Sequence, residues 1–337
     1  MNEDHTSDES DRQRTTGRRS FVRAAVAGTA LVGGSGMVAG KPGNSGNGSG
    51  GKGGGNGNGG GKGFPPNGIT EYGRSVDLGD GEVRTFTTET PSGNPKYHGV
   101  ELDRSALEGL PSADDLEGAD NRDETDKYRA GGQATEVHFK QSLQFFVPFP
   151  DAEETPFTFL GLNWNPKGHP GGGGAWERKH FDIHFHTLDT DVIDGIKGPD
   201  YSPYDEIPDE KIPEGYNRPP ASVAGERYIT DMGEHLAPAD APEIPANPGA
   251  FTNTLIQGFI GVNEEGDDLG KNPRLAFVEP MITREFLRDH SGTENYDVPQ
   301  PDEYPYDEPT HHPTGYSVRD VPAKDAVVVA IQEFEEV

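Results

Sequence analysis

The residues best suited to chemistry lie in one heptapeptide, His180-Phe181-Asp182-Ile183-His184-Phe185-His186. Its polar and apolar residues alternate strictly, and successive side chains of a β-strand point to opposite faces of a sheet. The three histidines and the aspartate are therefore expected on one face, and the two phenylalanines and the isoleucine on the other. Imidazole nitrogen is the commonest protein ligand of divalent first-row metals, so a metal site is the favoured interpretation. A solvated outer face without metal is the alternative.

Other histidines carry less weight. His169 stands in a loop rich in glycine and proline just before the heptapeptide, where it is expected either to cover the site or to be exposed. His311 and His312 lie in an acidic, proline-rich segment and are expected to be solvated. The chain contains no cysteine, which excludes disulfides and thiolate ligands. It also contains no nucleophile elbow, phosphate loop or dinucleotide fingerprint.

The elements that must position these side chains are short runs of Val, Ile, Phe and Thr between turn residues, a pattern typical of strands. The expected fold is mainly β with a minor α+β character, an antiparallel β-barrel or sandwich. Short helices are expected over Ser105–Leu110 and Arg284–His290, after the capping residues Asp103 and Thr283. The expected strands are Glu82–Thr88, Lys96–Glu101, Thr135–Pro148, Phe157–Asn163, His180–Leu188, Asn253–Val262, Leu275–Ile282 and Ala326–Phe334.

Three polar, proline-rich insertions interrupt the strand pattern, over Ser112–Gly132, Asp194–Pro220 and Tyr296–Pro313. Connecting segments of this composition usually run over the surface of a protein. We therefore expect long acidic surface loops within one domain that covers residues 68–337.

The chain is strongly acidic, with 29 Lys and Arg against 58 Asp and Glu and a formal net charge of −29. Binding to nucleic acid requires a basic face that replaces phosphate counterions, so this composition argues against a nucleic-acid partner. High salt screens the self-repulsion of such a surface, which favours a protein from a halophilic archaeon. An ordinary acidic secreted protein is the alternative.

Residues 1–67 are expected to target and tether the domain. Residues 1–39 contain Arg18-Arg19, Phe21 and a weakly apolar stretch of small residues, in the order typical of a twin-arginine signal. Residues 40–67 are mostly Gly, Asn, Ser and Lys, which predicts a disordered linker. We expect the twin-arginine machinery to export the chain already folded, to the cell surface or the medium, with no stable membrane insertion of the mature chain.

Several ordered motifs carry a family resemblance. They are Gly161-Leu162-Asn163-Trp164-Asn165-Pro166-Lys167-Gly168-His169-Pro170, the first six residues of the heptapeptide, Met232-Gly233-Glu234-His235 and Phe277-Val278-Glu279-Pro280-Met281-Ile282-Thr283. Upstream, Gly93-Asn94-Pro95 and Leu107-Glu108-Gly109-Leu110-Pro111 fit the same pattern. From about Gly73 to Leu287 the chain thus resembles the TTHB210-like domain family. The resemblance implies an exported or envelope protein and says little about its activity.

The resemblance also implies a set of site residues. The recurring polar positions of the family fall on His180, Asp182, His184, His235 and Glu279, and we expect His180, His184, His235 and Glu279 to be the metal ligands. Asp182, His186 and His169 stand beside them as further ligands or as hydrogen-bond partners of the imidazoles. His186 ranks below the others, because an aromatic residue usually stands at its position in the family. Three imidazoles and one carboxylate suit Zn²⁺, Mn²⁺, Fe²⁺ or Ni²⁺.

Three functions remain open from the sequence. The favoured one is an exported metal-binding β-domain that uses this cluster for binding or sensing. The second is a metal-dependent enzyme, a hydrolase or an oxidoreductase, with an open coordination position and Glu279 as a base instead of a ligand. The third is a structural or assembly module in which a buried polar network holds no metal. A closed homo-oligomer is compatible with all three.

Overall fold

The computed structural model describes residues 63–118, 134–138, 142–150, 154–169, 173–196, 207–218, 228–229, 231–262, 272–306 and 309–337. The second of two units along the chain, Asn56–Val337, is compact and contains every described residue. The predicted signal and nearly all of the predicted linker therefore lie outside the described residues. Within the ranges given above, no helix combines the length and the apolar character needed to cross a membrane.

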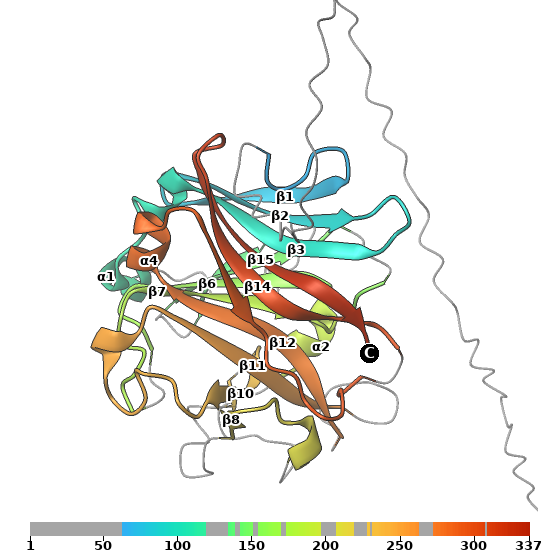
Figure 1. The fold of residues 1–337 in the computed structure, drawn as a ribbon. Helices are drawn as coiled ribbons and strands as arrows, with labels where there is room; N and C mark the ends of the chain where they lie inside the picture. Colours follow the sequence, from blue (N-terminus) through green and yellow to red (C-terminus); the bar gives the residue numbers. More distant parts are fainter. Residues whose placement is uncertain are drawn as a thin grey trace, which may run out of the picture. The chain divides into compact units, whose positions relative to one another are not determined.

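A six-stranded antiparallel sheet forms one layer of the second unit, in the order β1-β2-β3-β15-β14-β13 (Figure 1). Its strands are β1 (Thr70–Leu78), β2 (Gly81–Glu89), β3 (Pro95–Asp103), β13 (Thr293–Asp297), β14 (His311–Val321) and β15 (Ala326–Glu336). Because β15 pairs with β3, the C-terminal hairpin joins the N-terminal strands in one sheet.

A nine-stranded antiparallel sheet forms the other layer, in the order β4-β5-β6-β7-β12-β11-β10-β8, with β9 paired to β10. Its strands are β4 (Ala134–His138), β5 (Ser142–Pro148), β6 (Phe159–Asn165), β7 (His180–His186), β8 (Tyr216–Asn217), β9 (Tyr228–Ile229), β10 (Gly233–Pro238), β11 (Asn253–Val262) and β12 (Asn272–Thr283). Over the described residues neither sheet closes on itself. The mainly β prediction is therefore confirmed, in its sandwich form.

The helical segments are short. They are η1 (Arg104–Leu107), α1 (Ala113–Gly118), α2 (Thr190–Asp194), η2 (Asp209–Lys211), η4 (Pro248–Ala250) and α4 (Arg284–Asp289). The predicted cap of α4 is confirmed, because Thr283 Oγ1 accepts a hydrogen bond from the Phe286 backbone N–H. The helix predicted after Asp103 is only one 3₁₀ turn, η1, and the Asp103 carboxylate instead accepts from the Glu82 backbone N–H at 3.2 Å.

One apolar core lies between the two sheets. Phe181, Ile183 and Phe185 of β7 are fully buried in it, and the ring of Phe185 stacks on that of Phe149 at 5.7 Å. The ring of His98, on β3 of the six-stranded sheet, lies 5.2 Å from that of Phe149, which directly follows β5 of the nine-stranded sheet. The odd-numbered residues of β7 thus face the core, and its even-numbered residues lie on the opposite face of the sheet.

Several details differ from the sequence-based expectations. The strand expected over Thr135–Pro148 is instead the antiparallel pair β4 and β5. Ile207 and Tyr216, within the second expected insertion, are buried apolar residues of the core. Val298, within the third, is buried as well, so parts of these segments serve the core rather than the surface.

The ends of the third insertion also differ from expectation. His312 was expected to be solvated, but it lies on β14, is 1% exposed, and its Nδ1 is 2.7 Å from the Tyr306 hydroxyl.

At the N-terminal end of the domain, Phe64 is buried against Phe86 and Tyr97. Packing therefore begins ahead of residue 68.

Candidate metal centre

The polar residues of β7 lie side by side on the face of the nine-stranded sheet that points away from the core. His180, Asp182, His184 and His186 are between 0% and 4% exposed. Antiparallel pairing with β6 and β12 places more polar or small residues around them, namely Asn165 and Thr283 opposite His180, Asn163 opposite Asp182 and Gly161 opposite His184. Burying this many polar groups costs free energy unless each one finds a partner.

His184, His235 and Glu279 form one compact group from three strands, with candidate ligand atoms all within 4.8 Å of one another. His184 Nε2 lies 3.4 Å from Glu279 Oε1, and His235 Nε2 lies 3.8 Å from Glu279 Oε2. The ring of Phe277 packs against both histidines, at 4.7 Å from His184 and 5.1 Å from His235. The Glu279 carboxylate thus presents one oxygen to each imidazole.

Backbone carbonyls fix the orientation of both imidazoles in this group. His184 Nδ1 is 3.3 Å from the Gly161 carbonyl, and His235 Nδ1 is 3.1 Å from the Gly233 carbonyl. A neutral imidazole that donates from Nδ1 carries its lone pair on Nε2, toward the carboxylate. His184 Nε2 and Glu279 Oε2 are both buried without a hydrogen-bond partner in the described part of the chain.

His169, His180 and Asp182 form a second group of the same kind. His180 Nε2 lies 3.0 Å from Asp182 Oδ1, and His169 Nε2 lies 3.6 Å from Asp182 Oδ2. His180 Nδ1 is 2.6 Å from the Arg178 carbonyl, so its Nε2 also faces a carboxylate. The Asn165 side-chain amide donates to Asp182 Oδ2 at 2.8 Å and holds that carboxylate in place.

The structure therefore divides the four expected ligands. It brings three of them together, but His180 belongs to the other group, with Asp182 and His169. The physical reason is the rise of a strand: four residues along β7 separate the Cα atoms of His180 and His184 by about 13 Å. Two histidines that share a sheet face at this spacing do not reach a common ion.

His186 joins neither group. Its ring stacks on Phe159 at 4.4 Å and on His184 at 5.5 Å, and it is 1% exposed. Gly161 makes room for it, because a Cβ at that position would lie 2.8 Å from His186 Nε2. His186 thus packs beside the site, where the family resemblance implies an aromatic residue.

Burial controls the titration of the first group. It lowers the pKa of His184 to about 3, with a smaller contribution from His235 in the same direction. It raises the pKa of Glu279 well above its ordinary value, and the nearby charge of Asp182 adds to this effect. The isolated group therefore favours a neutral imidazole and a protonated carboxyl.

Asp182 behaves differently from Glu279. Burial by itself would raise the pKa of Asp182, but the charges of His180 and His169 hold it well below its ordinary value. The second group therefore keeps an ionised carboxylate between two imidazoles.

Three amide side chains on this face were not among the sequence-based candidates. Asn165 contacts Asp182, whereas Gln144 Oε1 and Asn163 Oδ1 are buried with no hydrogen-bond partner among the residues described. Gln144 lies opposite Asn163 across β5 and β6. The alternation Asn163-Trp164-Asn165 has the same period as the heptapeptide, and this signal could have placed both asparagines on the polar face.

Comparison with known protein families, with curated proteins and with solved structures gives no match for this chain. The resemblance to the TTHB210-like domain family therefore stays a prediction, and the assignment of a function depends on the geometry of the two groups.

Proposed function

We propose that the protein is an exported metal-binding β-domain in which His184, His235 and Glu279 hold a divalent transition metal. One observation carries the proposal: buried His184 Nε2 faces Glu279 Oε1 at 3.4 Å, with its Nδ1 turned to a backbone carbonyl. A nitrogen lone pair and a carboxylate oxygen repel each other at this distance unless a proton or a cation lies near both. A divalent cation satisfies both atoms and keeps the carboxylate ionised.

The spacing of the donor atoms also supports a metal. Two donors that bind one ion at about 2.1 Å with a tetrahedral angle lie about 3.4 Å apart. The separations of 3.4 Å and 3.8 Å from Glu279 to the two imidazoles are close to this value. Two imidazoles and a carboxylate suit Zn²⁺, Mn²⁺, Fe²⁺ and Ni²⁺ alike.

The group of His169, His180 and Asp182 is proposed to hold a second ion. His180 Nε2 and Asp182 Oδ1 are both buried, and at 3.0 Å their geometry is not that of a hydrogen bond. The contact from the Asn165 amide to Asp182 is of the kind that orients metal-binding carboxylates in other proteins.

Metal content by elemental mass spectrometry tests the proposal. The chain is purified in high salt without a histidine tag, stripped with a chelator and reloaded with Zn²⁺. We expect about two equivalents of zinc, and about one in each of the variants His184→Ala and His180→Ala. Glu279→Gln, which preserves the size of the side chain, should also lose the ion of its own group.

The matched control is His311→Ala, which removes a histidine on β14, in the other sheet. It should keep both equivalents. If the wild-type chain binds no Zn²⁺, Mn²⁺, Fe²⁺ or Ni²⁺ while circular dichroism shows it folded, the proposal fails. A polar network without metal then remains, in which protonated Glu279 donates to His184.

A second candidate function is a metal-dependent hydrolase or oxidoreductase. Three protein ligands leave a tetrahedral ion one open position, as in catalytic zinc sites, and the His235 side chain is 17% exposed. Both Glu279 oxygens face imidazoles, which favours a ligand role over that of a base. Azide added to Co²⁺-loaded protein should change the visible spectrum if that position is open, and should leave it unchanged if the site is closed.

The proposed location is outside the cell, as a secreted or surface-held protein. The support is the twin-arginine pattern of residues 1–39, which also makes the twin-arginine machinery a proposed partner. A fusion of residues 1–67 to a reporter that folds before export tests the location. Replacing Arg18 and Arg19 with lysines should abolish export of that reporter.

A further inference from the structure

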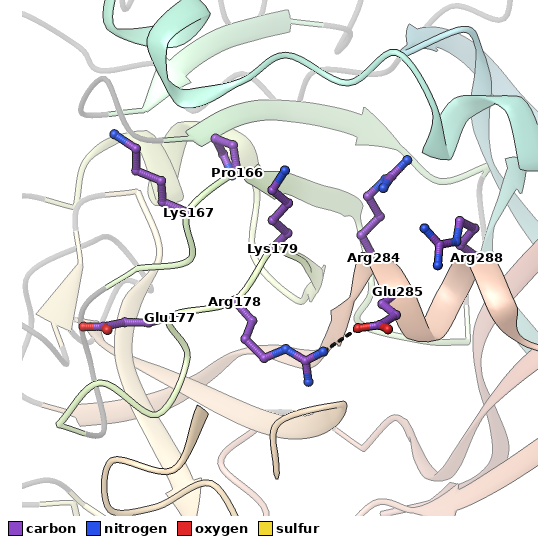
Figure 2. Close-up of a pocket in the computed structure, with 8 residues that line it drawn as sticks. All are labelled: Pro166, Lys167, Glu177, Arg178, Lys179, Arg284, Glu285 and Arg288. Carbon is purple, nitrogen blue, oxygen red and sulfur yellow. Dashed lines mark hydrogen bonds and ion pairs between the residues drawn. The ribbon is translucent and has the colours of Figure 1, made fainter. Parts of the chain in front are cut away.

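A hollow of about 490 Å³ opens beside the end of the nine-stranded sheet where β7 begins and β12 ends (Figure 2). It is lined by residues that follow β6, residues that precede β7, and helix α4. Five of its lining side chains are cationic, namely Lys167, Arg178, Lys179, Arg284 and Arg288. Two glutamates, Glu177 and Glu285, are the acidic residues of its lining.

This charge is opposite to that of the whole chain. The chain has twice as many acidic as basic residues, 58 against 29, yet the hollow has five basic residues and two acidic ones. Among the residues that the structure describes, carboxylates pair with the three arginines of the lining but not with its two lysines, and a bound anion would compensate the charge of those lysines. The local excess of positive charge therefore needs a reason that composition does not supply.

Three of the cations are held by contacts with the protein. Arg178 donates to the Phe251 carbonyl and pairs with Glu285 at 2.6 Å, the contact drawn in Figure 2. Arg284 donates to the Leu107 carbonyl and pairs with Glu108. Arg288 pairs with Asp289 at 2.8 Å. These contacts orient the guanidinium groups before any ligand arrives.

The two lysines differ from the arginines. Lys167 and Lys179 are exposed, and neither forms an ion pair within the described part of the chain. In Figure 2 the side chains of Lys167, Lys179 and Arg284 all extend upward in the view, with Lys167 at the left and Arg284 at the right. Ammonium and guanidinium groups donate charge-assisted hydrogen bonds, which the oxygens of an oxyanion accept.

We propose that this hollow binds a small oxyanion with two or more negative charges, namely a phosphate or sulfate group, free or as the ester of a small molecule. Each arginine already pairs with a carboxylate, so the charge available to a ligand is that of the two lysines, and two cations favour such an anion over a single carboxylate. The volume lies within the range of small-molecule pockets, about 300–1,000 Å³. This site is separate from the proposed metal ligands and does not depend on them.

Isothermal titration calorimetry on the full chain tests the proposal, with inorganic phosphate, sulfate and glycerol phosphate as probes. The buffer is potassium gluconate at an ionic strength that keeps the chain folded, because chloride competes for cationic sites. We expect saturable binding of at least one probe. A stronger response to glycerol phosphate than to inorganic phosphate would identify an ester as the ligand, and the reverse order a free anion.

The test variant is Lys167→Gln/Lys179→Gln, which leaves the arginine contacts in place. We expect it to bind at least about tenfold more weakly, since each lysine would lose a charge-assisted hydrogen bond to the anion. The control is Lys96→Gln, which removes an exposed lysine of β3 in the other sheet and should leave the affinity unchanged. The proposal is overturned if none of the three probes shows saturable binding, or if the double variant binds with the same affinity as the wild-type chain.

Discussion

At the scale of single residues, a buried histidine of the candidate site differs from a buried histidine of the core in its hydrogen-bond partners. His98 is fully buried, and its two ring nitrogens lie 3.2 Å from Thr87 Oγ1 and 2.8 Å from Thr155 Oγ1. His184 is equally buried, but its Nε2 has no hydrogen-bond partner among the described residues and faces a carboxylate. Burial lowers the pKa of both to about 3, so the contrast lies in their partners and not in their titration.

His98, whose two ring nitrogens both have hydrogen-bond partners, gives a prediction for the pH dependence of stability. The pKa of His98 is about 3 in the folded chain against 6.5 as its ordinary value, so the unfolded chain takes up the proton first. The free energy of unfolding is therefore expected to fall as the pH drops below 6.5. The His98 contribution is about 1.4 kcal/mol per pH unit, or about 2 kcal/mol between pH 6.5 and pH 5.

Urea unfolding at these two pH values, for wild type and His98→Gln, measures this contribution. Acidic residues also affect the pH slope, but they are common to both proteins, so the difference between the slopes isolates His98. We expect a shallower slope in the variant. Equal slopes would contradict a neutral, buried His98.

At the scale of elements, strands other than β7 also shape the site. Gly258 of β11 pairs with Phe277 of β12, and a Cβ at Gly258 would lie 2.0 Å from the Phe277 ring. That ring contacts both His184 and His235. The glycine therefore leaves room for the aromatic ring that packs against both imidazoles.

Gly258→Ala is accordingly expected to destabilise the fold by about 1–3 kcal/mol, because the ring must move or the strands must separate. It should also weaken the binding of Co²⁺, since Phe277 positions both imidazoles. Urea unfolding and a spectroscopic Co²⁺ titration measure the two effects. The control is Gly249→Ala, where the nearest atom to a new Cβ is 3.8 Å away. If both variants behave alike, Phe277 does not constrain the site.

At the scale of the whole molecule, charge is distributed unevenly. The whole chain has a net charge of −29, whereas basic residues outnumber acidic ones in the lining of the hollow beside the nine-stranded sheet. At low ionic strength the many carboxylates repel one another over several ångströms, and salt shortens that range to about 3 Å at 1 M. The fold should therefore depend on salt for its stability.

We expect the midpoint of thermal unfolding to rise as KCl increases from 0.1 M to 2 M, with most of the gain below about 1 M, where screening changes most. Differential scanning calorimetry measures the midpoint. NaCl should give the same curve as KCl, because screening does not depend on the identity of the cation. A midpoint that is independent of salt would contradict adaptation to high salt.

Local alternation was sufficient to predict much of the fold. The strands β2, β3, β7, β11, β12 and β15 were all expected within a few residues of their observed bounds. The cap of α4 at Thr283 was expected as well, because capping depends on a few neighbouring residues. Six strands were not expected, namely β1, β8, β9, β10, β13 and β14. The burial of β1 and β13 is largely intermediate or exposed, so they carry a weak alternation signal.

The sequence by itself determined that the polar residues of β7 share one sheet face, because the side-chain period of a strand is a local property. Only the tertiary structure decided which of them act together. Grouping depends on the arrangement of the other elements around β7. Glu279 comes from the adjacent strand β12, His235 from β10, which is two strands further along the sheet, and His169 from the loop after β6. Such contacts join residues far apart in the chain, and the alternation within one strand does not say which other strands will lie near it.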